Sequence, residues 1–245
     1  MLNFSVKLTS RVIGISATYE STRIYCMEYL TDGEPDFFVS ITPADIEYER
    51  EKAAREDMLE GLPVRNLSDA QLEITAVQRK IAEELFDYNT LLFHGSVVAV
   101  NGEGYLFTAK SGTGKSTHTR LWRQVFGDRA MMVNDDKPFL RIAEQGITVC
   151  GSPWNGKHGL GANVEVPLRA ICLLERGDEN VVHPISAKEA VFMLLQQSNR
   201  PQDPLRMPRY LDLLDRLSQG VAFYRMACNM SPEAAMVAYE TMSRK

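Results

Sequence analysis

The sequence predicts an α/β (α+β) protein with a mixed, partly antiparallel sheet, preceded by a small β-rich N-terminal domain. Three observations support this. A glycine-rich loop lies between the short apolar strand 104–108 and a helical segment that ends near residue 126. A second β-like run, 96–101, is joined to that strand by a short glycine-bearing turn, which indicates an antiparallel hairpin. The first forty residues hold short β-like runs separated by turn signals.

Composition indicates an ordinary globular protein. The 245 residues allow one large domain or two small ones, and the chain is 44% hydrophobic and 24% charged. The formal net charge of −5 offers no basic surface for nucleic acid or an acidic membrane. No run approaches the ~18–20 apolar residues of a membrane span, and residues 1–17 make a poor signal peptide. Because the four cysteines form no C-x-x-C pair, we expect reduced thiols and a cytoplasmic protein.

The predicted N-terminal domain combines strands with one charged helix. Thr42 caps that helix with Pro43 in its first turn, and the helix continues to about Leu59. Its residues are nearly all charged, which favours a solvated face with i,i+4 ion pairs. The β-like runs before it are 4–17, 23–30 and 37–41.

The boundary between the domains is predicted at 65, dividing the chain into 1–65 and 66–245. Gly61-Leu62-Pro63 ends the charged helix there. Ser68-x-x-Gln71 is a capping box that starts another helix, and the boundary can alternatively follow this helix near residue 88. Four apolar residues at helical spacing form its buried stripe: Leu72, Val77, Ile81 and Leu85.

After the hairpin, the predicted elements alternate irregularly. A helix follows the glycine-rich loop, and the strand 130–133 comes next. Residues 137–175 read as further strands with a long glycine-rich connection, 151–161. The remaining predicted elements are a helix capped by Ser186 with Glu189, a helix over 203–219, a strand over 221–227 and a last helix starting at Ser231.

The glycine-rich loop, 109–117, matches a phosphate-binding loop except at one position. Gly112 and Gly114 let the backbone curl so that several N–H groups converge at a helix start. Ala109 stands where the pattern has glycine, and alanine tolerates most backbone angles short of positive φ. The sequence therefore predicts that ATP and Mg²⁺ bind here. The residues expected at the nucleotide are Ser111, Gly112, Thr113, Gly114, Lys115, Ser116 and Thr117.

Within this loop, two side chains have distinct expected tasks. Lys115 would reach the β- and γ-phosphates, and the hydroxyl of Ser116 would ligate Mg²⁺. A chance Gly-Lys-Ser on a surface turn is the alternative. The flanking strand and helix argue against that alternative, because a phosphate loop needs this context.

Two adjacent acids, Asp135 and Asp136, follow the strand 130–133 about twenty residues after the loop lysine. With one helix and one strand in that gap, the strand should lie next to the loop strand, with both carboxylates at its carboxyl end. One carboxylate can hold Mg²⁺ with Ser116, and the other can take the proton of an attacking hydroxyl. A solvated strand-end turn is the alternative.

Other polar residues are weaker candidates. His94 precedes Gly95 at a strand start and could hydrogen-bond the catalytic aspartate, or could be structural. Lys157 lies in the glycine-rich connection and could clamp the γ-phosphoryl group, or could lie on a flexible surface loop. His118 is expected to be structural, and Trp154 is expected to pack. A basic patch among prolines could bind an anionic substrate or simply be solvated: Arg200, Arg206 and Arg209.

These residues together resemble the catalytic domain of HPr kinase/phosphorylase, whose fold is shared with phosphoenolpyruvate carboxykinase. The shared order is His-Gly, a hairpin strand, the Gly-x-Gly-Lys-Ser loop, a helix and a strand ending in Asp-Asp. The resemblance is good over 91–140 and looser to 245, where the 151–168 stretch and the 200–228 run also look like that group. Residues 1–65 do not resemble the HPr kinase amino-terminal domain.

The resemblance implies a nucleotide loop in a mostly antiparallel sheet, and it implies roles for individual residues. Asp135 matches the aspartate that activates the incoming seryl hydroxyl, with His94 as its partner, and Asp136 matches the second acid, nearest the metal. Lys115 and Ser116 match the loop lysine and the metal-binding hydroxyl. The HPr kinase signature that follows the acidic strand is not recognisable here, which argues against HPr itself as the acceptor.

We therefore expect an ATP- and Mg²⁺-dependent kinase that transfers the γ-phosphoryl group to a Ser/Thr-type hydroxyl of a peptide or protein. A kinase for a free amino acid or metabolite and a non-catalytic nucleotide-binding regulatory module are the alternatives. A carboxykinase is disfavoured because it needs additional metal ligands on a much longer chain. The expected partner is a peptide, protein or small-molecule hydroxyl acceptor, with neither nucleic acid nor a membrane. The resemblance leaves a homo-oligomer possible, because HPr kinases assemble as hexamers, and the sequence does not decide the oligomeric state.

Overall fold

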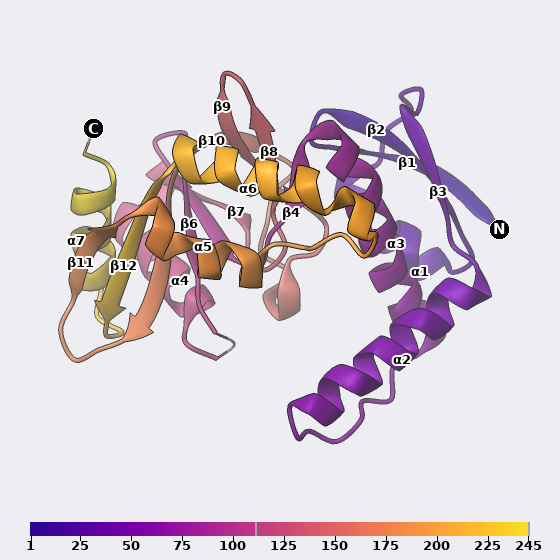
Figure 1. The fold of residues 1–245 in the computed structure, drawn as a ribbon, viewed down its shortest axis with the longest axis horizontal. Helices are drawn as coiled ribbons and strands as arrows, with labels where there is room; N and C mark the ends of the chain where they lie inside the picture. Colours follow the sequence, from indigo (N-terminus) through magenta and orange to yellow (C-terminus); the bar gives the residue numbers. More distant parts are fainter. Residues whose placement is uncertain (111, 245) are drawn as a thin grey trace. The chain divides into compact units, whose positions relative to one another are not determined.

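The computed structural model describes residues 1–110 and 112–244. The chain forms two compact units, Met1–Leu85 and Phe86–Lys245 (Figure 1). The first unit contains a three-stranded sheet with order β1-β2-β3, formed by β1 (Leu2–Leu8), β2 (Arg11–Ala17) and β3 (Phe37–Ser40). β1 and β2 form a two-residue hairpin, in which Thr9 and Ser10 both have positive φ. The run predicted as one strand over 4–17 is therefore a hairpin.

The predicted strand over 23–30 is wrong. This segment forms helix α1 (Glu20–Tyr25) and the 3-10 helix η1 (Met27–Tyr29). The reason lies in Glu73, a fully buried residue of α3 (Asp69–Leu85). Its carboxylate accepts the backbone N–H groups of Thr18 and Tyr19 at 2.6 and 2.9 Å and the Thr22 hydroxyl at 2.6 Å. These bonds fix the two residues that precede α1 and hold Thr22 in its first turn.

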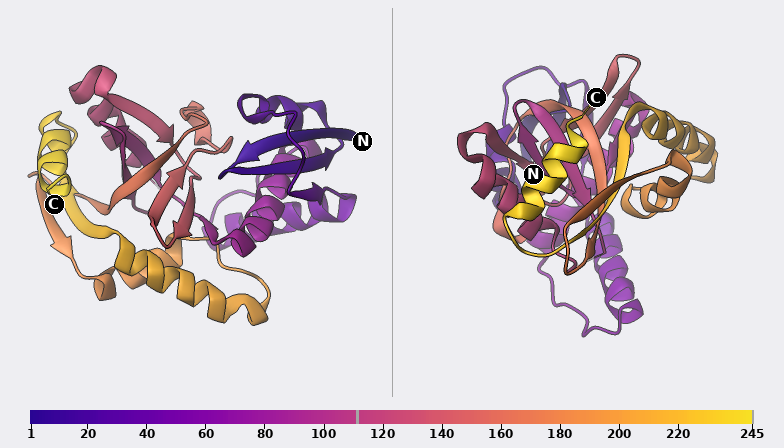
Figure 2. Two further views of the ribbon diagram at one scale, coloured as in Figure 1. Left: turned by 90° about the horizontal axis from the view of Figure 1, so that it is seen from above. Right: turned by 90° about the vertical axis from the view of Figure 1, so that its left-hand side faces the viewer.

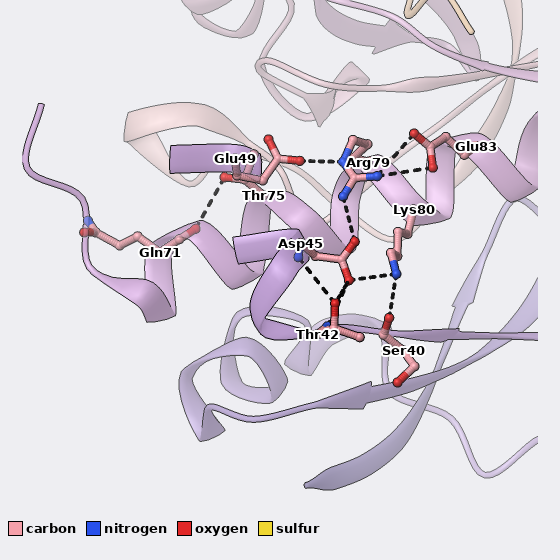
Figure 3. A network of polar contacts seen from close by, with 9 residues as sticks. All are labelled: Ser40, Thr42, Asp45, Glu49, Gln71, Thr75, Arg79, Lys80 and Glu83. Carbon is pink, nitrogen blue, oxygen red and sulfur yellow. Dashed lines mark hydrogen bonds and ion pairs between the residues drawn. The ribbon is translucent and has the colours of Figure 1, made fainter. Parts of the chain in front are cut away.

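Helix α2 (Pro43–Leu59) begins and ends where the sequence predicts, and Thr42 forms a capping box with Asp45. The prediction of a solvated helix is wrong for one of its sides. Glu49 and Asp57 are each only 2% exposed. Glu49 accepts a 2.6 Å hydrogen bond from Nε of Arg79 on α3, so this face of α2 is held to α3 by ion pairs (Figure 3).

Helix α3 belongs with the first unit. Its capping box of Ser68 and Gln71 forms as predicted, and its apolar stripe is buried. The helix packs against α1, α2, β2 and β3, and the compact unit ends at Leu85, just before the 3-10 helix η2 (Phe86–Tyr88). A boundary at 65 separates α3 from the elements that it contacts, because its apolar face needs them for burial.

The second unit contains a curled, mixed sheet. Its nine strands among the described residues are β4 (Thr90–Leu92), β5 (Ser96–Val100), β6 (Glu103–Thr108), β7 (Ala130–Asn134), β8 (Phe139–Ala143), β9 (Gly146–Cys150), β10 (Glu165–Arg176), β11 (Val181–Ile185) and β12 (Ala222–Cys228). Seven follow the order β4-β8-β9-β10-β6-β5-β7, and β12 and β11 continue from β10. The start of β10 pairs antiparallel with β9, whereas the rest of β10 runs parallel to β6 and β12.

Strand β7 does not lie next to the loop strand β6, as the sequence analysis expected. Strand β5 lies between them and is antiparallel to both. β6 and β7 are consequently parallel to each other, so their carboxyl ends lie at the same edge of the sheet. The prediction that β7 pairs with β6 is wrong, but the prediction that both strands end at the same edge of the sheet is confirmed.

Helices cover both faces of this sheet (Figure 2). On one face, α4 (Lys115–Phe126) and α7 (Glu233–Met242) enclose a core that includes Phe107, Trp122 and Met226. On the other, α5 (Ala187–Gln197) and α6 (Met207–Gly220) cover a core that includes Leu106 and Phe223. Short 3-10 helices are η3 (Gly127–Arg129), η4 (Gly156–His158) and η5 (Pro204–Arg206). Among the described residues, no helix combines the length and apolarity required to cross a membrane.

Candidate nucleotide-binding site

The glycine-rich loop connects β6 to α4, as the sequence predicts. Gly112 and Gly114 have φ of 75° and 122°, a region that favours glycine, and α4 begins at Lys115. Ala109 is 1% exposed and is not among the non-glycine residues with positive φ, so the prediction that alanine fits there is confirmed. Ser111 lies outside the described residues. The arrangement directs the free N–H groups of the first turn of α4 toward the loop.

Two cations hold the loop. Nζ of Lys115 donates to the carbonyl oxygen of Ala109 at 3.3 Å, and Arg176 at the end of β10 donates from Nη2 to the carbonyl oxygen of Gly112 at 2.7 Å. Burial lowers the pKa of Lys115, and the negative charges of Asp136 and Asp135 act against that shift. The lysine therefore interacts with both acids from the side of the loop.

Asp135 is linked to the first turns of α4. It is 6% exposed and accepts a 2.7 Å hydrogen bond from the hydroxyl of Ser96 at the start of β5. That hydroxyl is 2.9 Å from Oγ1 of Thr119, which in turn is 3.3 Å from the carbonyl oxygen of Ser116. The Ser96 bond is the one hydrogen bond that the carboxylate accepts from the described residues. The carboxylate therefore keeps acceptor capacity for a further donor or a cation.

Asp136 is more accessible and pairs with His94. Nε2 of His94 is 3.3 Å from Oδ1 of Asp136, and the two side chains are 31% and 34% exposed. Burial alone raises the pKa of Asp136, but the His94 hydrogen bond and the charges of Lys137 and Lys115 outweigh it, so the pKa lies below its usual range. The structure thus pairs His94 with Asp136, whereas the resemblance implied Asp135.

Backbone hydrogen bonds fix this pair. The N–H of His94 donates to the carbonyl oxygen of Gln197 at 2.7 Å, and the N–H of Gly95 donates to that of Asp136 at 3.0 Å. The approach to β5 and the end of β7 are thereby joined at the sheet edge where the loop lies.

Asn134 orients the acids and was missed from the sequence. Its Oδ1 accepts the N–H groups of Asp136 and Lys137 at 2.9 and 2.7 Å, and its Nδ2 donates to the Ser152 carbonyl at 3.1 Å and to Oδ1 of Asn155 at 2.8 Å. An asparagine that binds backbone two residues on is a recognised turn signal. The bonds from Asn134 to the two following N–H groups were therefore predictable from the sequence. Its bonds to Ser152 and Asn155 were not, because these residues come from the distant glycine-rich connection.

That connection reaches Asp136, but it does not place Lys157 on the acids. A Cβ on Gly156 would be 3.2 Å from the Cβ of Asp136. Lys157 follows on an exposed turn, where the structure shows it in no hydrogen bond or ion pair with another described residue. The predicted clamp by Lys157 stays a prediction.

The remaining candidates have structural roles. His118 accepts a 3.1 Å hydrogen bond from Nε1 of Trp122, and burial lowers its pKa to about 4, so it is a neutral core histidine as expected. Trp154 is 5% exposed and packs edge-on against Phe139. In the basic patch, Arg206 pairs with Asp87 at 2.7 Å, and Arg209 donates to the backbone of the same residue.

No group of three or more His, Cys, Asp or Glu side chains within 1–110 and 112–244 could hold a metal. A divalent cation here would depend on a hydroxyl, one or two carboxylates, phosphate oxygens and water, which is how Mg²⁺ is usually held. The buried Asp135 carboxylate with a single hydrogen bond, linked through Ser96 and Thr119 to the turn of Ser116, fits such a cation.

The fold and site thus define an α/β protein with a mixed sheet, in which a glycine-rich loop and an acidic strand end meet at one sheet edge. The chain belongs to the family described as SynChlorMet cassette protein ScmC, whose model matches residues 63–236. No curated protein matches the chain.

A solved structure of the Hpr(Ser) kinase/phosphatase from Coxiella burnetii is similar to this chain at 11% sequence identity. The similarity covers 61% of this chain and 95% of that one, with a TM-score of 0.35. At that TM-score it carries no argument about fold or activity.

Proposed function

We propose that this protein is an ATP- and Mg²⁺-dependent kinase that phosphorylates a Ser/Thr-type hydroxyl of a peptide or protein. One observation carries the proposal: the half-buried loop lysine, Lys115, lies at the same sheet edge as two adjacent acids, and one of these acids is paired with His94. Phosphoryl transfer depends on positioning and charge stabilisation, together with a group that accepts the hydroxyl proton. This constellation contains residues for each task.

In this proposal, the loop binds the triphosphate. The N–H groups over 112–117 and the ammonium of Lys115 would contact phosphate oxygens, as at other helix N-termini that bind anions. Bound Mg²⁺ would supply charge neutralisation at the β- and γ-phosphates. The anion also favours the charged form of Lys115, which burial disfavours.

The contacts favour a division of roles between the acids that reverses the one implied by the resemblance. Asp135 is nearly buried and is linked to the turn of Ser116, which suits a cation ligand. Asp136 is partly exposed, so an incoming hydroxyl can reach it, and His94 can share the proton that it accepts. We therefore place Mg²⁺ at Ser116 and Asp135, and the acceptor hydroxyl at Asp136 with His94.

Two matched variants test this division. Asp136→Asn should leave Mg²⁺-dependent ATP binding within about threefold and reduce transfer by about 10²–10⁴, the usual contribution of a general base. Asp135→Asn should instead weaken ATP binding in the presence of Mg²⁺ and not in its absence, measured by calorimetry. If Asp135→Asn keeps the Mg²⁺ effect while Asp136→Asn loses it, the roles implied by the resemblance apply instead.

The activity itself is tested by incubating the protein with γ-labelled ATP and a panel of peptides, proteins and free amino acids. Label on a serine or threonine of a polypeptide supports the proposal. Label only on small hydroxyl compounds would identify a small-molecule kinase. Tight ATP binding without transfer to any acceptor would contradict an enzyme and support a nucleotide-binding regulatory module.

A further inference from the structure

A cavity of about 470 Å³ lies beside the loop, on the face of the sheet covered by α4. Its walls come from three parts of the second unit: the loop glycines, the first turns of α4, and the residues at the ends of β10 and β12. The volume is within the ~300–1,000 Å³ of typical small-molecule sites. None of the residues proposed for phosphoryl transfer, apart from the loop and the start of α4, contributes to it.

The topology places this cavity opposite the acids. β6, β10 and β12 run parallel, so their carboxyl ends share one edge, where open α/β sheets bind ligands. Asp135 and Asp136 follow β7, which lies on the other side of β6 beyond β5. The loop therefore lies between the acids on one side and the cavity on the other.

The lining suits a flat, mostly apolar group. Leu121 and Cys228 line the cavity, and Met230, which is 78% exposed, lies at its rim. A methionine sulfur makes favourable contacts with aromatic rings. His118 also lines the cavity as a neutral imidazole whose Nε2 already accepts from Trp122.

One nitrogen of His118 has no hydrogen-bond partner among the described residues. Because Nε2 is an acceptor, the proton of the neutral ring is on Nδ1, and Nδ1 is buried without a hydrogen-bond partner among the described residues. A buried donor without a partner costs free energy. Nδ1 is closed to the cavity, so a ligand there would be held by the cavity walls and not by this donor.

We infer that this cavity binds the nucleoside half, base and ribose, of the nucleoside triphosphate whose phosphates the loop holds. The inference rests on the proposed function. It also fixes the direction of the nucleotide: with the base on the β10–β12 side, the chain of phosphates crosses the loop toward β7. The terminal phosphate then lies beside Asp136 and His94, where transfer requires it.

The unmodified protein offers a direct test, because Cys228 lines the cavity and is half-buried, whereas Cys26, Cys150 and Cys172 are buried. Its alkylation by N-ethylmaleimide is followed by mass spectrometry with Mg²⁺ and either ATP or inorganic tripolyphosphate. With each ligand at about ten times its Kd, mass action leaves roughly a tenth of the sites free. ATP should then slow the reaction of Cys228 about tenfold, whereas tripolyphosphate should slow it less than twofold.

Calorimetry on the same samples separates the two ways of failing. If both ligands bind and neither protects Cys228, or both protect it equally, the nucleoside lies elsewhere and the inference is overturned while the proposed function stands. If ATP does not bind at all, the proposed function fails first.

A variant provides a second measurement. Cys228→Trp fills the cavity and should reduce the affinity for ATP to that for tripolyphosphate, leaving the latter unchanged. Leu205→Trp, at a position 89% exposed on η5, is the matched control and should change neither affinity. Unchanged ATP affinity in a folded Cys228→Trp protein would also overturn the inference.

Discussion

Arg79 provides the sharpest stability prediction, because it joins α2 and α3 through acids that have little access to water (Figure 3). The guanidinium is 15% exposed and lies 2.6 Å from Glu49, 3.0 Å from Asp45 and 3.3 Å from Glu83. Burial opposes the charge of Arg79, but the hydrogen bonds to Glu49 and Asp45 outweigh it, so the pKa of Arg79 is raised above its usual value. We consider the substitution Arg79→Met, which keeps an unbranched apolar stem and removes the charged guanidinium.

The magnitude follows from which acid loses its partner. Asp45 keeps Lys80 at 2.9 Å, and Glu83 is exposed enough to turn toward water. Glu49 is 2% exposed and keeps no other hydrogen bond among the described residues. Removing one partner of a buried ion pair typically costs about 3–5 kcal/mol.

We therefore expect Arg79→Met to lower the unfolding free energy of the first unit by about 3–5 kcal/mol at pH 7. Hydrogen exchange of peptides from α2 and α3 in urea measures this, while fluorescence of Trp122 and Trp154 follows the second unit alone. Arg55→Met, which removes an exposed pair with Glu51, is the control and should cost under ~0.5 kcal/mol.

A loss below about 1 kcal/mol at pH 7 would refute this reasoning. The double variant Arg79→Met with Glu49→Met should recover most of the loss, because apolar replacement of a buried pair is often neutral. If the double variant does not recover the lost stability, the loss comes from the missing packing of Arg79 and not from the unpaired carboxylate of Glu49.

The other predictions concern pH, the loop and α1. Burial raises the pKa of Asp45, but its hydrogen bonds to Lys80 and Thr42 outweigh burial, so the pKa is lowered. The stability that the Asp45 carboxylate contributes is therefore complete above the unfolded pKa of about 3.9 and is lost as the pH falls further. Acid denaturation of the Asp45→Asn variant should lack this loss. Lys115→Ala should weaken ATP binding in calorimetry. Because burial lowers the pKa of Lys115, ATP binding at alkaline pH should take up protons, seen as a dependence of binding heat on buffer, and Lys115→Arg should abolish it. Glu73→Leu should cost about 2 kcal/mol, since it removes three hydrogen bonds at the start of α1 and leaves the buried Thr22 hydroxyl without this partner; urea denaturation equal to wild type would contradict this.

Much of the local structure was predictable from the sequence. The caps at Thr42, Ser68 and Ser186 join residues three positions apart, so a single short window contains both partners. The hairpin of β5 and β6 follows in the same way from its turn, and the loop glycines from the backbone angles that they must adopt. Each of these signals is local because the hydrogen bond or the φ angle that produces it is local.

The candidate site was only partly predictable for a related reason. The acids, the loop lysine and His94 could be named, because each residue type at a strand or helix end indicates its chemistry. The acid that His94 contacts could not be predicted, because β5 inserts between β6 and β7 and decides which of the two acids faces His94. The bonds of Asn134 to the 151–161 connection were equally invisible.

By itself, then, the sequence determined where the capped helices begin, the curled loop before α4 and the residue types available for chemistry, because these depend on contacts within a few positions. Tertiary structure decided that residues 20–25 are helical through an acid 51 positions beyond Thr22, that Glu49 is buried, and that the loop lies between the acids and a cavity. Burial, and the electrostatics that follow from it, are set by which distant segments exclude water from one another, and no short window of sequence contains both.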